Sequence, residues 1–349
     1  MKAIVKNHDG QDGWAIIDYP RRDPADDEIE MKVMSAGICG SELHLWNDHH
    51  YYDPGCVVGH EFSGVISRVG KSVTDWKAGD RIITENRFTG CGKCEYCRTG
   101  KMAMCKQIKS MGYRYDGGWR NYMCLPTKQL IRIPDNVSYD EAAMVEPSAV
   151  LTEALCIKAP IHAGDAVLIQ GCGQMGLLGV MVAKAAGAGV VLITGTDIDE
   201  EIRLPVAREI GADRVVNVQR EDLAAVVNEL TDGRGVDYVV DCSGAPSAIR
   251  SAFDVVKRGG RIVGIGEVAG GKLELDWNKG IFKDVTLFFH YGSDYKAWHL
   301  VMDFIARGQL NLKPLITHDI SMADFREGFE LLNAKKGIKV MMHPIQEGY

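Results

Sequence analysis

A glycine-rich turn in the middle of the chain constrains the fold more than any other stretch. Residues 165–170 form a short, nearly all-apolar run, a G-x-G-x-x-G turn follows at once, and residues 177–186 read as an apolar helix. Between a strand and a helix, these glycines make the tight turn and admit a pyrophosphate, which the helix amides bind. The predicted nucleotide-binding residues are Gly171, Gly173, Gln174, Met175 and Gly176.

The chain continues with the same alternation after this turn. Apolar runs and helical stretches succeed one another at 190–194, 200–210, 214–218, 221–230, 236–241 and 260–266. Strands that alternate with helices form a parallel, doubly wound sheet. We therefore expect a dinucleotide-binding domain in this half of the chain.

The end of the second strand bears on the choice of cofactor. It stops at Gly195, where folds that prefer NAD commonly carry an acid for the ribose hydroxyls. Thr196, Asp197 and Asp199 follow on the loop, and Arg203 is the nearest base. Acids repel a 2′-phosphate, so NAD is favoured over NADP, with Gly195, Thr196, Asp197 and Arg203 as candidate cofactor residues.

A cluster of cysteines indicates a metal site of its own. Cys91, Cys94, Cys97 and Cys105 form a C-x2-C-x2-C-x7-C array within 15 residues. This spacing lets four sulfurs converge on one tetrahedral zinc ion, whereas the bacterial ferredoxin run ends in x3-C-P, which is absent here. Four thiolates leave no open position for a substrate, so we expect a structural zinc in a lobe at about residues 88–108.

A second group of metal-binding side chains precedes the cysteine array. Cys39, Ser41, His44, His60 and Glu61 fall within 23 positions, in a region whose alternating apolar residues and Gly, Pro and Asp turns predict a β-rich domain. Zinc takes sulfur, nitrogen and oxygen donors, and a catalytic site keeps one position open. On these residues alone, a buried thiol and a surface imidazole remain an alternative interpretation.

Glu146 is a carboxylate between apolar neighbours and a proline. An isolated carboxylate is costly to bury without a partner, and a metal ion would be one. A charge at the start of the following helix explains the residue equally well.

Composition excludes several classes of protein. The chain has 349 residues, 46% apolar and 25% charged, which predicts two domains of a soluble globular enzyme. A formal net charge of −7 without a basic patch argues against nucleic acid as the main partner. The chain start lacks the pattern of a signal peptide, and no apolar run is long enough to span a membrane. We expect a cytoplasmic protein with reduced thiols.

Taken together, these motifs resemble those of the zinc-containing medium-chain alcohol dehydrogenases, particularly the sorbitol (polyol) and threonine dehydrogenase branch. The resemblance runs nearly end to end and is carried by Cys39-Gly40-Ser41, Gly59-His60-Glu61, the cysteine lobe, Val145-Glu146-Pro147 and the glycine turn. It implies an α/β plus β fold, with a GroES-like catalytic β domain over residues 1–150 and 291–349. A Rossmann nucleotide-binding domain would span residues 151–290.

The resemblance also implies the composition of the metal site. Cys39 and His60 would bind a catalytic zinc, Glu61 would be a ligand or its exchange partner, and Glu146 would lie at or just behind the metal. Either Glu61 binds the ion directly while Glu146 waits behind a water, or the two carboxylates exchange as substrate enters. With the cysteine lobe, two zinc ions per chain are expected.

Ser41 and His44 match the proton relay of this family. Zinc as a Lewis acid lowers the pKa of an alcohol, Ser41 would take the proton, and His44 would release it to solvent. The nicotinamide would accept the hydride. A loop cap for Ser41 and an ordinary surface histidine for His44 are the alternatives.

Candidate substrate residues follow the relay. Trp46, His49 and Tyr51 lie on the loop expected to face the substrate, and hydroxyl-rich ligands suit aromatic walls with a few polar donors. A solvated surface loop is the alternative. His290 stands where polyol dehydrogenases tend to have an arginine, which opens the choice to another sugar alcohol, a sugar acid or a 3-hydroxy amino acid.

The leading hypothesis is NAD(P)-dependent oxidation of a secondary alcohol in a polyol, sugar or sugar-acid derivative. The alternatives are an L-threonine-type 3-dehydrogenase and a non-catalytic relative that binds nucleotide or metal. The family resemblance implies a homodimer or homotetramer, and the apolar strands near 260–266 and 285–289 offer a sheet edge for a second chain.

Overall fold

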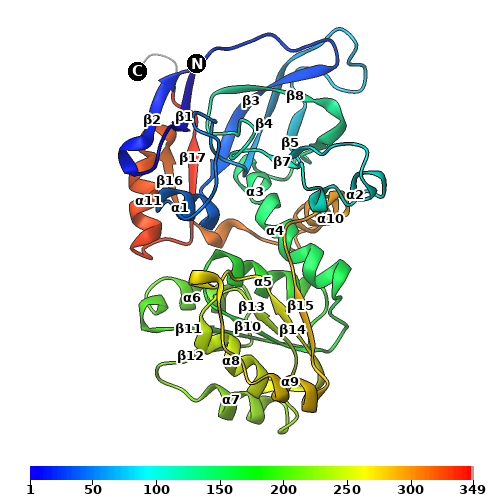
Figure 1. The fold of residues 1–349 in the computed structure, drawn as a ribbon, viewed down its shortest axis with the longest axis vertical. Coiled ribbons are helices and arrows are strands. Elements are labelled where there is room, and N and C mark those ends of the chain that lie inside the picture. Colours follow the sequence, from blue (N-terminus) through cyan, green and yellow to red (C-terminus); the bar gives the residue numbers. More distant parts are fainter. Residues whose placement is uncertain (347–349) are drawn as a thin grey trace. The chain divides into compact units, whose positions relative to one another are not determined.

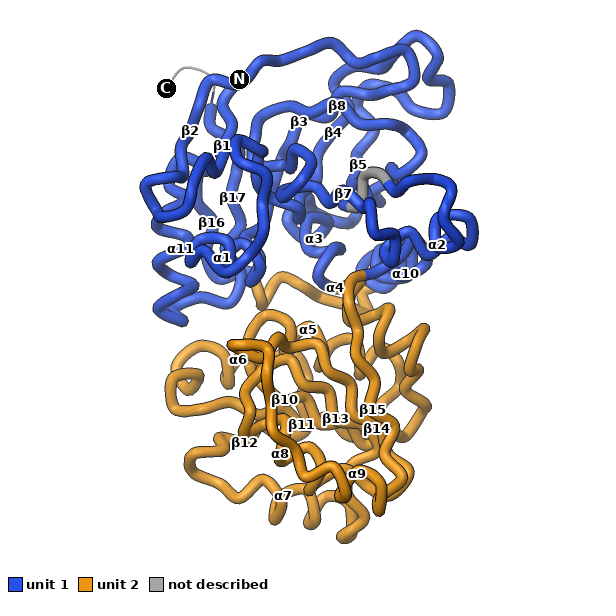
Figure 2. Tube along the Cα trace, viewed as in Figure 1, with its two compact units in different colours: residues 1–147, 293–307, 316–349 blue, residues 148–292, 308–315 orange. Residues whose placement is uncertain are grey.

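The computed structural model describes residues 1–346, with the side chains of residues 87–89 excepted. The chain divides into two compact units (Figure 2). Unit 1 comprises Met1–Pro147, Ser293–Arg307 and the chain from Ile316, and unit 2 comprises Ser148–Gly292 and Gly308–Leu315. The α/β plus β class predicted from the sequence is confirmed.

Unit 1 is built on a seven-stranded sheet (Figure 1). The strand order is β16 (Ile316–Ser321), β17 (Lys339–His343), β3 (Glu28–Gly37), β4 (Phe62–Val69), β5 (Arg81–Thr84) and β9 (Leu130–Arg132), and β8 (Tyr122–Pro126) pairs with β3. Only β16 and β17 run parallel within this sheet as described. The last strands of the chain therefore complete the sheet that the first strands begin.

Two small sheets and six α-helices complete the described part of unit 1, besides short 3-10 turns. The small sheets are β1 (Lys2–Lys6) with β2 (Trp14–Asp18), and β6 (Arg87–Thr89) with β7 (Lys109–Ser110). The helices are α1 (Gly40–Trp46), α2 (Glu95–Arg98), α3 (Tyr139–Ala143), α4 (Val145–Thr152, which crosses into unit 2), α10 (Tyr295–Ala306) and α11 (Phe325–Asn333).

The core of unit 1 contains a cluster of packed aromatic rings. Trp14, Trp46, Trp119 and Phe329 are almost completely buried, and Phe329 of α11 stacks on Trp46 of α1 with ring centroids 4.5 Å apart. Stacked and edge-on aromatic pairs stabilise a core beyond the apolar area that they bury. This packing fixes α1, which carries several of the predicted site residues, against the C-terminal part of the chain.

Unit 2 is a six-stranded sheet whose strands are all parallel. The strand order is β12 (Arg214–Asn217), β11 (Val190–Gly195), β10 (Ala166–Gln170), β13 (Val236–Asp241), β14 (Val256–Gly264) and β15 (Thr286–Phe289). The helices are α5 (Gln174–Ala185), α6 (Arg203–Glu209), α7 (Leu223–Leu230), α8 (Pro246–Val255) and α9 (Trp277–Lys283). The predicted strand and helix alternation is thus present, and the order reverses between β10 and β13, where such sheets bind nucleotides.

Residues 308–315 group with unit 2, although the sequence places them with the catalytic domain. Leu310, Leu312 and Leu315 are buried, and the short helix that ends at Leu315 contacts α6. Apolar burial therefore draws this segment to the nucleotide-binding unit. Within the described part of the chain, every helix is too short or too polar to cross a membrane.

Candidate active site and metal centres

Helix α1 begins at the first predicted zinc ligand. Cys39 is its N-cap residue, and the Glu42 carboxylate accepts a hydrogen bond from the Cys39 amide at 2.9 Å through Oε2. The other oxygen of Glu42, Oε1, lies 2.5 Å from Nδ1 of His60. Glu42 is fully buried, so one carboxylate holds both predicted ligands, Cys39 and His60, in place.

This arrangement decides which nitrogen of His60 faces the site. A histidine that donates its Nδ1 proton to a carboxylate presents Nε2 as its lone pair, the usual arrangement behind a metal-bound imidazole. Nε2 of His60 lies 3.8 Å from a carboxylate oxygen of Glu146. The imidazole therefore lies between two carboxylates, with Nδ1 toward Glu42 and Nε2 toward Glu146.

Buried charge at this site favours a cation. Burial by itself lowers the pKa of His60, but Glu42 and Cys39 outweigh it and raise that pKa well above its ordinary value. Burial, followed by the charge of Glu61, raises the pKa of the Cys39 thiol. The surroundings of Cys39 and His60 therefore stabilise positive charge, which a divalent metal ion would supply.

Glu61 and Glu146 complete a set of metal-binding groups. One oxygen of Glu61, Oε2, pairs with the buried amine of Lys339, which also donates to the carbonyl of Ile38 at 3.1 Å. The other oxygen, Oε1, is buried and has no hydrogen-bond partner among residues 1–346. Glu146 accepts a hydrogen bond from Asn86 at 2.7 Å.

These donors fit a zinc ion. One ligand atom each of His60, Glu61 and Glu146 lies within 4.8 Å of the others, and the same holds for Cys39, Glu42 and His60. A thiol, an imidazole and carboxylates, with a buried oxygen that lacks a hydrogen bond, match the ligand set of a catalytic zinc. Both predicted carboxylates therefore lie beside His60, and Glu61 already forms an ion pair with Lys339.

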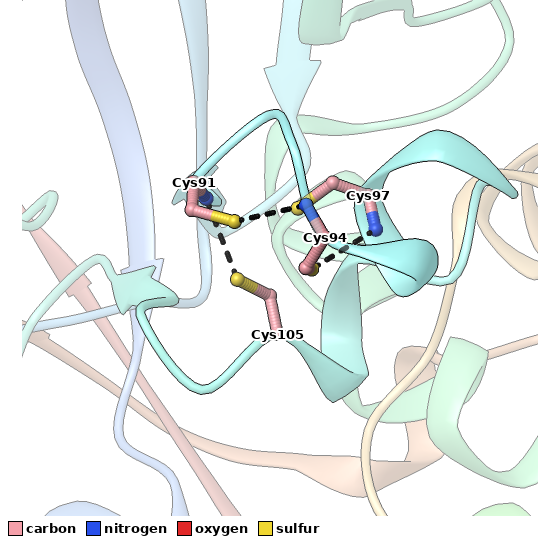
Figure 3. Close-up of side chains that lie close together, drawn as sticks. All are labelled: Cys91, Cys94, Cys97 and Cys105. Atoms are coloured by element: carbon pink, nitrogen blue, oxygen red, sulfur yellow. Dashed lines mark hydrogen bonds between the residues drawn. The ribbon is translucent and has the colours of Figure 1, made fainter.

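The four-cysteine lobe forms a second, separate cluster. The Sγ atoms of its four cysteines lie within 4.8 Å of one another. Figure 3 shows the four side chains gathered in one place. The amides of Cys94 and Cys97 donate to the preceding cysteine sulfurs at 3.3 and 3.5 Å, and the amide of Cys91 donates to Cys105 at 3.4 Å. Backbone amides of Lys93 and Cys94 lower the pKa of Cys91 to about 6. A thiolate cluster held by amides fits a closed, tetrahedral zinc site.

The predicted relay residues lie on α1. Ser41 is half-buried in the first turn, and its Oγ accepts a hydrogen bond from the Tyr113 hydroxyl at 2.7 Å. Burial, followed by the charges of Glu42 and Cys39, raises the pKa of Tyr113 well above its ordinary value, so the phenol keeps its proton. His44 is exposed in the last turn, three residues after Ser41 and therefore on the same side of the helix.

The glycine turn of unit 2 has the geometry that its sequence predicts. Gly171 has a φ of +97°, and Gly173 is the N-cap of α5. A Cβ on Gly176 would lie 1.8 Å from the carbonyl oxygen of Gly171, which no side chain tolerates. Gln174 and Met175 open α5, so the first turn of the helix directs its free amides out of the loop.

The end of β11 carries the other predicted cofactor residues. Thr196 donates to Asp199 through its amide at 2.9 Å and through its hydroxyl at 3.0 Å, and Arg203 pairs with the same carboxylate. A Cβ on Gly195 would crowd Leu204 at 2.6 Å. Asp197 accepts from Arg220 at 2.7 Å and stays half-exposed. Of the two aspartates on this loop, Asp197 is therefore the more open to a ligand, since Asp199 is buried.

Comparison with known proteins assigns the chain. The alcohol dehydrogenase GroES-like domain family matches residues 25–135, and the zinc-binding dehydrogenase family matches residues 175–307. The sorbitol dehydrogenase of Halalkalibacterium halodurans is 33% identical, over 99% of this chain and 100% of that protein. The chain belongs to the zinc-containing medium-chain alcohol dehydrogenases.

Two further similar proteins act on different alcohols by name. The L-threonine 3-dehydrogenase of Rhizobium etli is 36% identical over 98% of both chains. The crystal structure of 2R,3R-butanediol dehydrogenase from Bacillus subtilis superposes with a TM-score of 0.89 at 28% identity, over 99% of both chains. This chain is accordingly a zinc-dependent dehydrogenase of alcohols that uses a nicotinamide cofactor, with a GroES-like and a Rossmann domain.

The predicted substrate residues of this dehydrogenase fall in different surroundings. Trp46 is 4% exposed and stacked in the core of unit 1, which removes it from the predicted substrate wall. Trp46 is the last residue of α1, and its ring packs against aromatic residues of α11. Because α11 lies near the C-terminus, this contact could not be predicted from the residues around Trp46. His49 is exposed, and Tyr51 is 46% exposed with its ring 5.9 Å from that of Tyr113. His290 belongs to unit 2 and lies buried beside Phe288.

Three residues that the motifs do not include contribute to the site. Lys339 is a lone charge in the apolar strand β17, and that isolation is a signal of a buried ion pair. Asn86 and Tyr113 lie in loops on either side of the cysteine lobe. They have no local signal, because their partners Glu146 and Ser41 are 60 and 72 residues away.

The role of Glu42 generates a direct test. Replacing it by Gln removes the charge behind His60, and loss of such a partner typically lowers metal affinity 10- to 100-fold. We expect the Glu42→Gln protein to lose catalytic-site zinc to a competing chelator at correspondingly lower chelator concentration. The exposed Glu95→Gln, on α2, is the control and should titrate like the wild type. Equal zinc retention in all three proteins would contradict the role of Glu42.

Proposed function

We propose that this dehydrogenase oxidises a secondary alcohol of a polyol, sugar or sugar-acid derivative, with NAD as the hydride acceptor. The observation that carries the proposal is that two close groups of donors, Cys39 with His60 and His60 with Glu61 and Glu146, share His60. The predicted relay serine, Ser41, lies on the helix that Cys39 begins. A four-cysteine site accounts for a structural ion, so a second, chemically different site is free to act on a substrate. Unit 1 would be the catalytic domain and unit 2 the nucleotide-binding domain.

Cys39 and His60 would hold the catalytic zinc, with Glu61 or Glu146 as the third protein ligand. Glu61 keeps Lys339 as its partner through one oxygen, so its other oxygen can bind metal without leaving the amine unpaired. Glu146 keeps Asn86 in the same way. Each carboxylate can therefore approach or leave the ion while its outer hydrogen bond persists, which supports exchange between the two.

The protein's own contribution to the reaction is to orient the alcohol and move its proton. When bound, zinc makes an alcohol more acidic and the nicotinamide accepts a hydride. Oxidation removes a hydride from the carbinol carbon and a proton from its oxygen. The acceptor oxygen of Ser41 would take that proton while the hydroxyl proton of Ser41 passes on toward His44. His44, three residues later on α1, is exposed to solvent and would be the group that releases the proton.

Several features support NAD over NADP. The half-exposed carboxylate of Asp197 follows the second strand, where it would bind ribose hydroxyls and repel a 2′-phosphate. Arg203 is engaged by Asp199 and Arg220 by Asp197, so both nearby guanidiniums already have carboxylate partners. Gly171, Gly173 and Gly176 would receive the pyrophosphate.

Two classes of substrate remain in competition. Relatives named for sorbitol and for threonine align with similar identity, 33% and 36%, so amino alcohol oxidation is the second candidate. His49, Tyr51 and His290 are the proposed substrate contacts. A non-catalytic role is disfavoured, since every residue that the zinc and relay chemistry requires is present. The reduced thiols that both zinc sites need suit the cytoplasm.

Nicotinamide reduction over a panel of alcohols tests the proposal. We expect turnover with sugar alcohols or sugar acids that exceeds turnover with L-threonine, and a higher kcat/KM for NAD than for NADP. Cys39→Ser should abolish turnover by removing a zinc ligand while nucleotide binding persists, because Cys39 lies in unit 1 and the glycine turn in unit 2. Full activity of that variant would refute the zinc-dependent mechanism.

The surface of unit 2 supports a homodimer. β15 is the last strand of the sheet, and Trp277, Phe282 and Phe289 on or beside it are 66%, 73% and 76% exposed. An exposed edge with large apolar side chains is a template for pairing with another chain. The same apolar edge on a second copy of the chain would bury these side chains, with the β15 strands of the two copies side by side.

Sedimentation of a charged variant tests the dimer. Phe289→Asp should convert a dimer into a monomer, or a tetramer into a smaller species, because a carboxylate would be buried at the contact. Leu230→Asp, at an exposed apolar position on α7, is the matched control and should leave the mass unchanged. A wild-type protein that sediments as a monomer would contradict the proposal.

A further inference from the structure

Tyr113 occupies a position in the site that none of the sequence motifs predicts. It lies in the loop between β7 and β8, is 6% exposed, and belongs to the core of unit 1. Its ring lies 5.4 Å from that of His60 and 4.6 Å from that of His50, measured between centroids. The Tyr113 ring therefore packs between the proposed zinc ligand His60 and His50 of the loop that follows α1.

The hydroxyl of Tyr113 has two polar neighbours. It donates to Oγ of Ser41 at 2.7 Å, and its oxygen lies 3.3 Å from Nδ1 of His60. The proton of that nitrogen is held by Glu42 at the shorter distance of 2.5 Å. The strong bond of the phenol is thus the one to Ser41.

A count of donors and acceptors shows what this bond does to Ser41. A serine hydroxyl has one donor hydrogen and two acceptor lone pairs. Tyr113 occupies one lone pair, which leaves one acceptor and one donor. A relay needs that combination, because Ser41 must accept a proton from the alcohol and be able to pass one on. The bond also selects one of the three staggered positions open to the serine side chain.

We propose that Tyr113 is a positioning residue that acts through Ser41, holding its hydroxyl in the orientation that accepts the proton of the substrate alcohol. The inference rests on the proposed function, since it needs Ser41 to be the proton acceptor. Tyr113 does not exchange a proton itself. Its phenol stays a donor throughout, and the atoms that change partners are those of the alcohol and of Ser41.

A purely structural role would depend on the ring, whereas the proposed role depends on the hydroxyl. Tyr113→Phe separates the two, because phenylalanine keeps the packing against His50 and His60 and removes only the hydrogen bond. Tyr19→Phe is the matched control, since the Tyr19 hydroxyl also donates within unit 1, to Asp116 at 2.5 Å.

The experiment is a double-mutant cycle of Tyr113→Phe and Ser41→Ala, read by the single-turnover rate of nicotinamide reduction and by thermal unfolding. Alone, Tyr113→Phe should slow turnover about tenfold, the rate equivalent of one hydrogen bond, and raise the solvent deuterium isotope effect. In the Ser41→Ala background it should change the rate by less than about twofold. Zinc content should stay at the wild-type value, and Tyr19→Phe should leave the rate and isotope effect unchanged.

Equal slowing in both backgrounds would overturn the proposal, since Tyr113 would then act independently of Ser41. So would an unchanged rate in the single variant. If the wild type oxidises no alcohol of the panel, the proposed function fails, and the unfolding cycle still decides the Tyr113 contact. Non-additive losses of Tm support the coupled pair, and additive losses refute it.

Discussion

Buried negative charge is the constraint on which unit 1 depends. Glu42 and Glu61 are fully buried, and a buried carboxylate without a partner costs several kcal/mol. The fold places a positive partner behind each of them, His60 for Glu42 and Lys339 for Glu61. His60 is itself a predicted zinc ligand, and Lys339 holds the predicted ligand Glu61, so the groups that stabilise the fold also orient the metal-binding side chains. A bound zinc ion would add positive charge beside Oε1 of Glu61, which has no hydrogen-bond partner among residues 1–346.

Helix α1 shows how few residues are needed to combine these functions. Cys39 is the N-cap of the helix, and Ser41 lies in its first turn. The Glu42 carboxylate accepts a hydrogen bond from the Cys39 amide, and His44 lies exposed in the last turn. The aromatic contact between Trp46 and Phe329 then anchors the helix to the C-terminal strands. A predicted zinc ligand, the relay residues and the carboxylate that supports the ligand thus lie on or at the start of one helix, which suits chemistry that depends on fixed distances.

Local spacing determined how much of this arrangement the sequence could predict. The glycine turn and the cysteine lobe are written within six and 15 residues, and both have the geometry that their spacing implies. The bond of Tyr113 to Ser41 and the ion pair of Lys339 with Glu61 join residues 72 and 278 positions apart, and no local pattern records such pairs. Trp46 was assigned to the substrate loop for the same reason, because its stacking partner lies on α11.

We infer that the chain holds two zinc ions in chemically different sites. Diffraction from crystals of the wild-type protein at the zinc absorption edge would locate each ion by its anomalous scattering. Two peaks per chain are expected, one enclosed by the four cysteines and one against Cys39 and His60 with a carboxylate of Glu61 or Glu146. A single peak, confined to the cysteine lobe in protein purified with zinc, would contradict it.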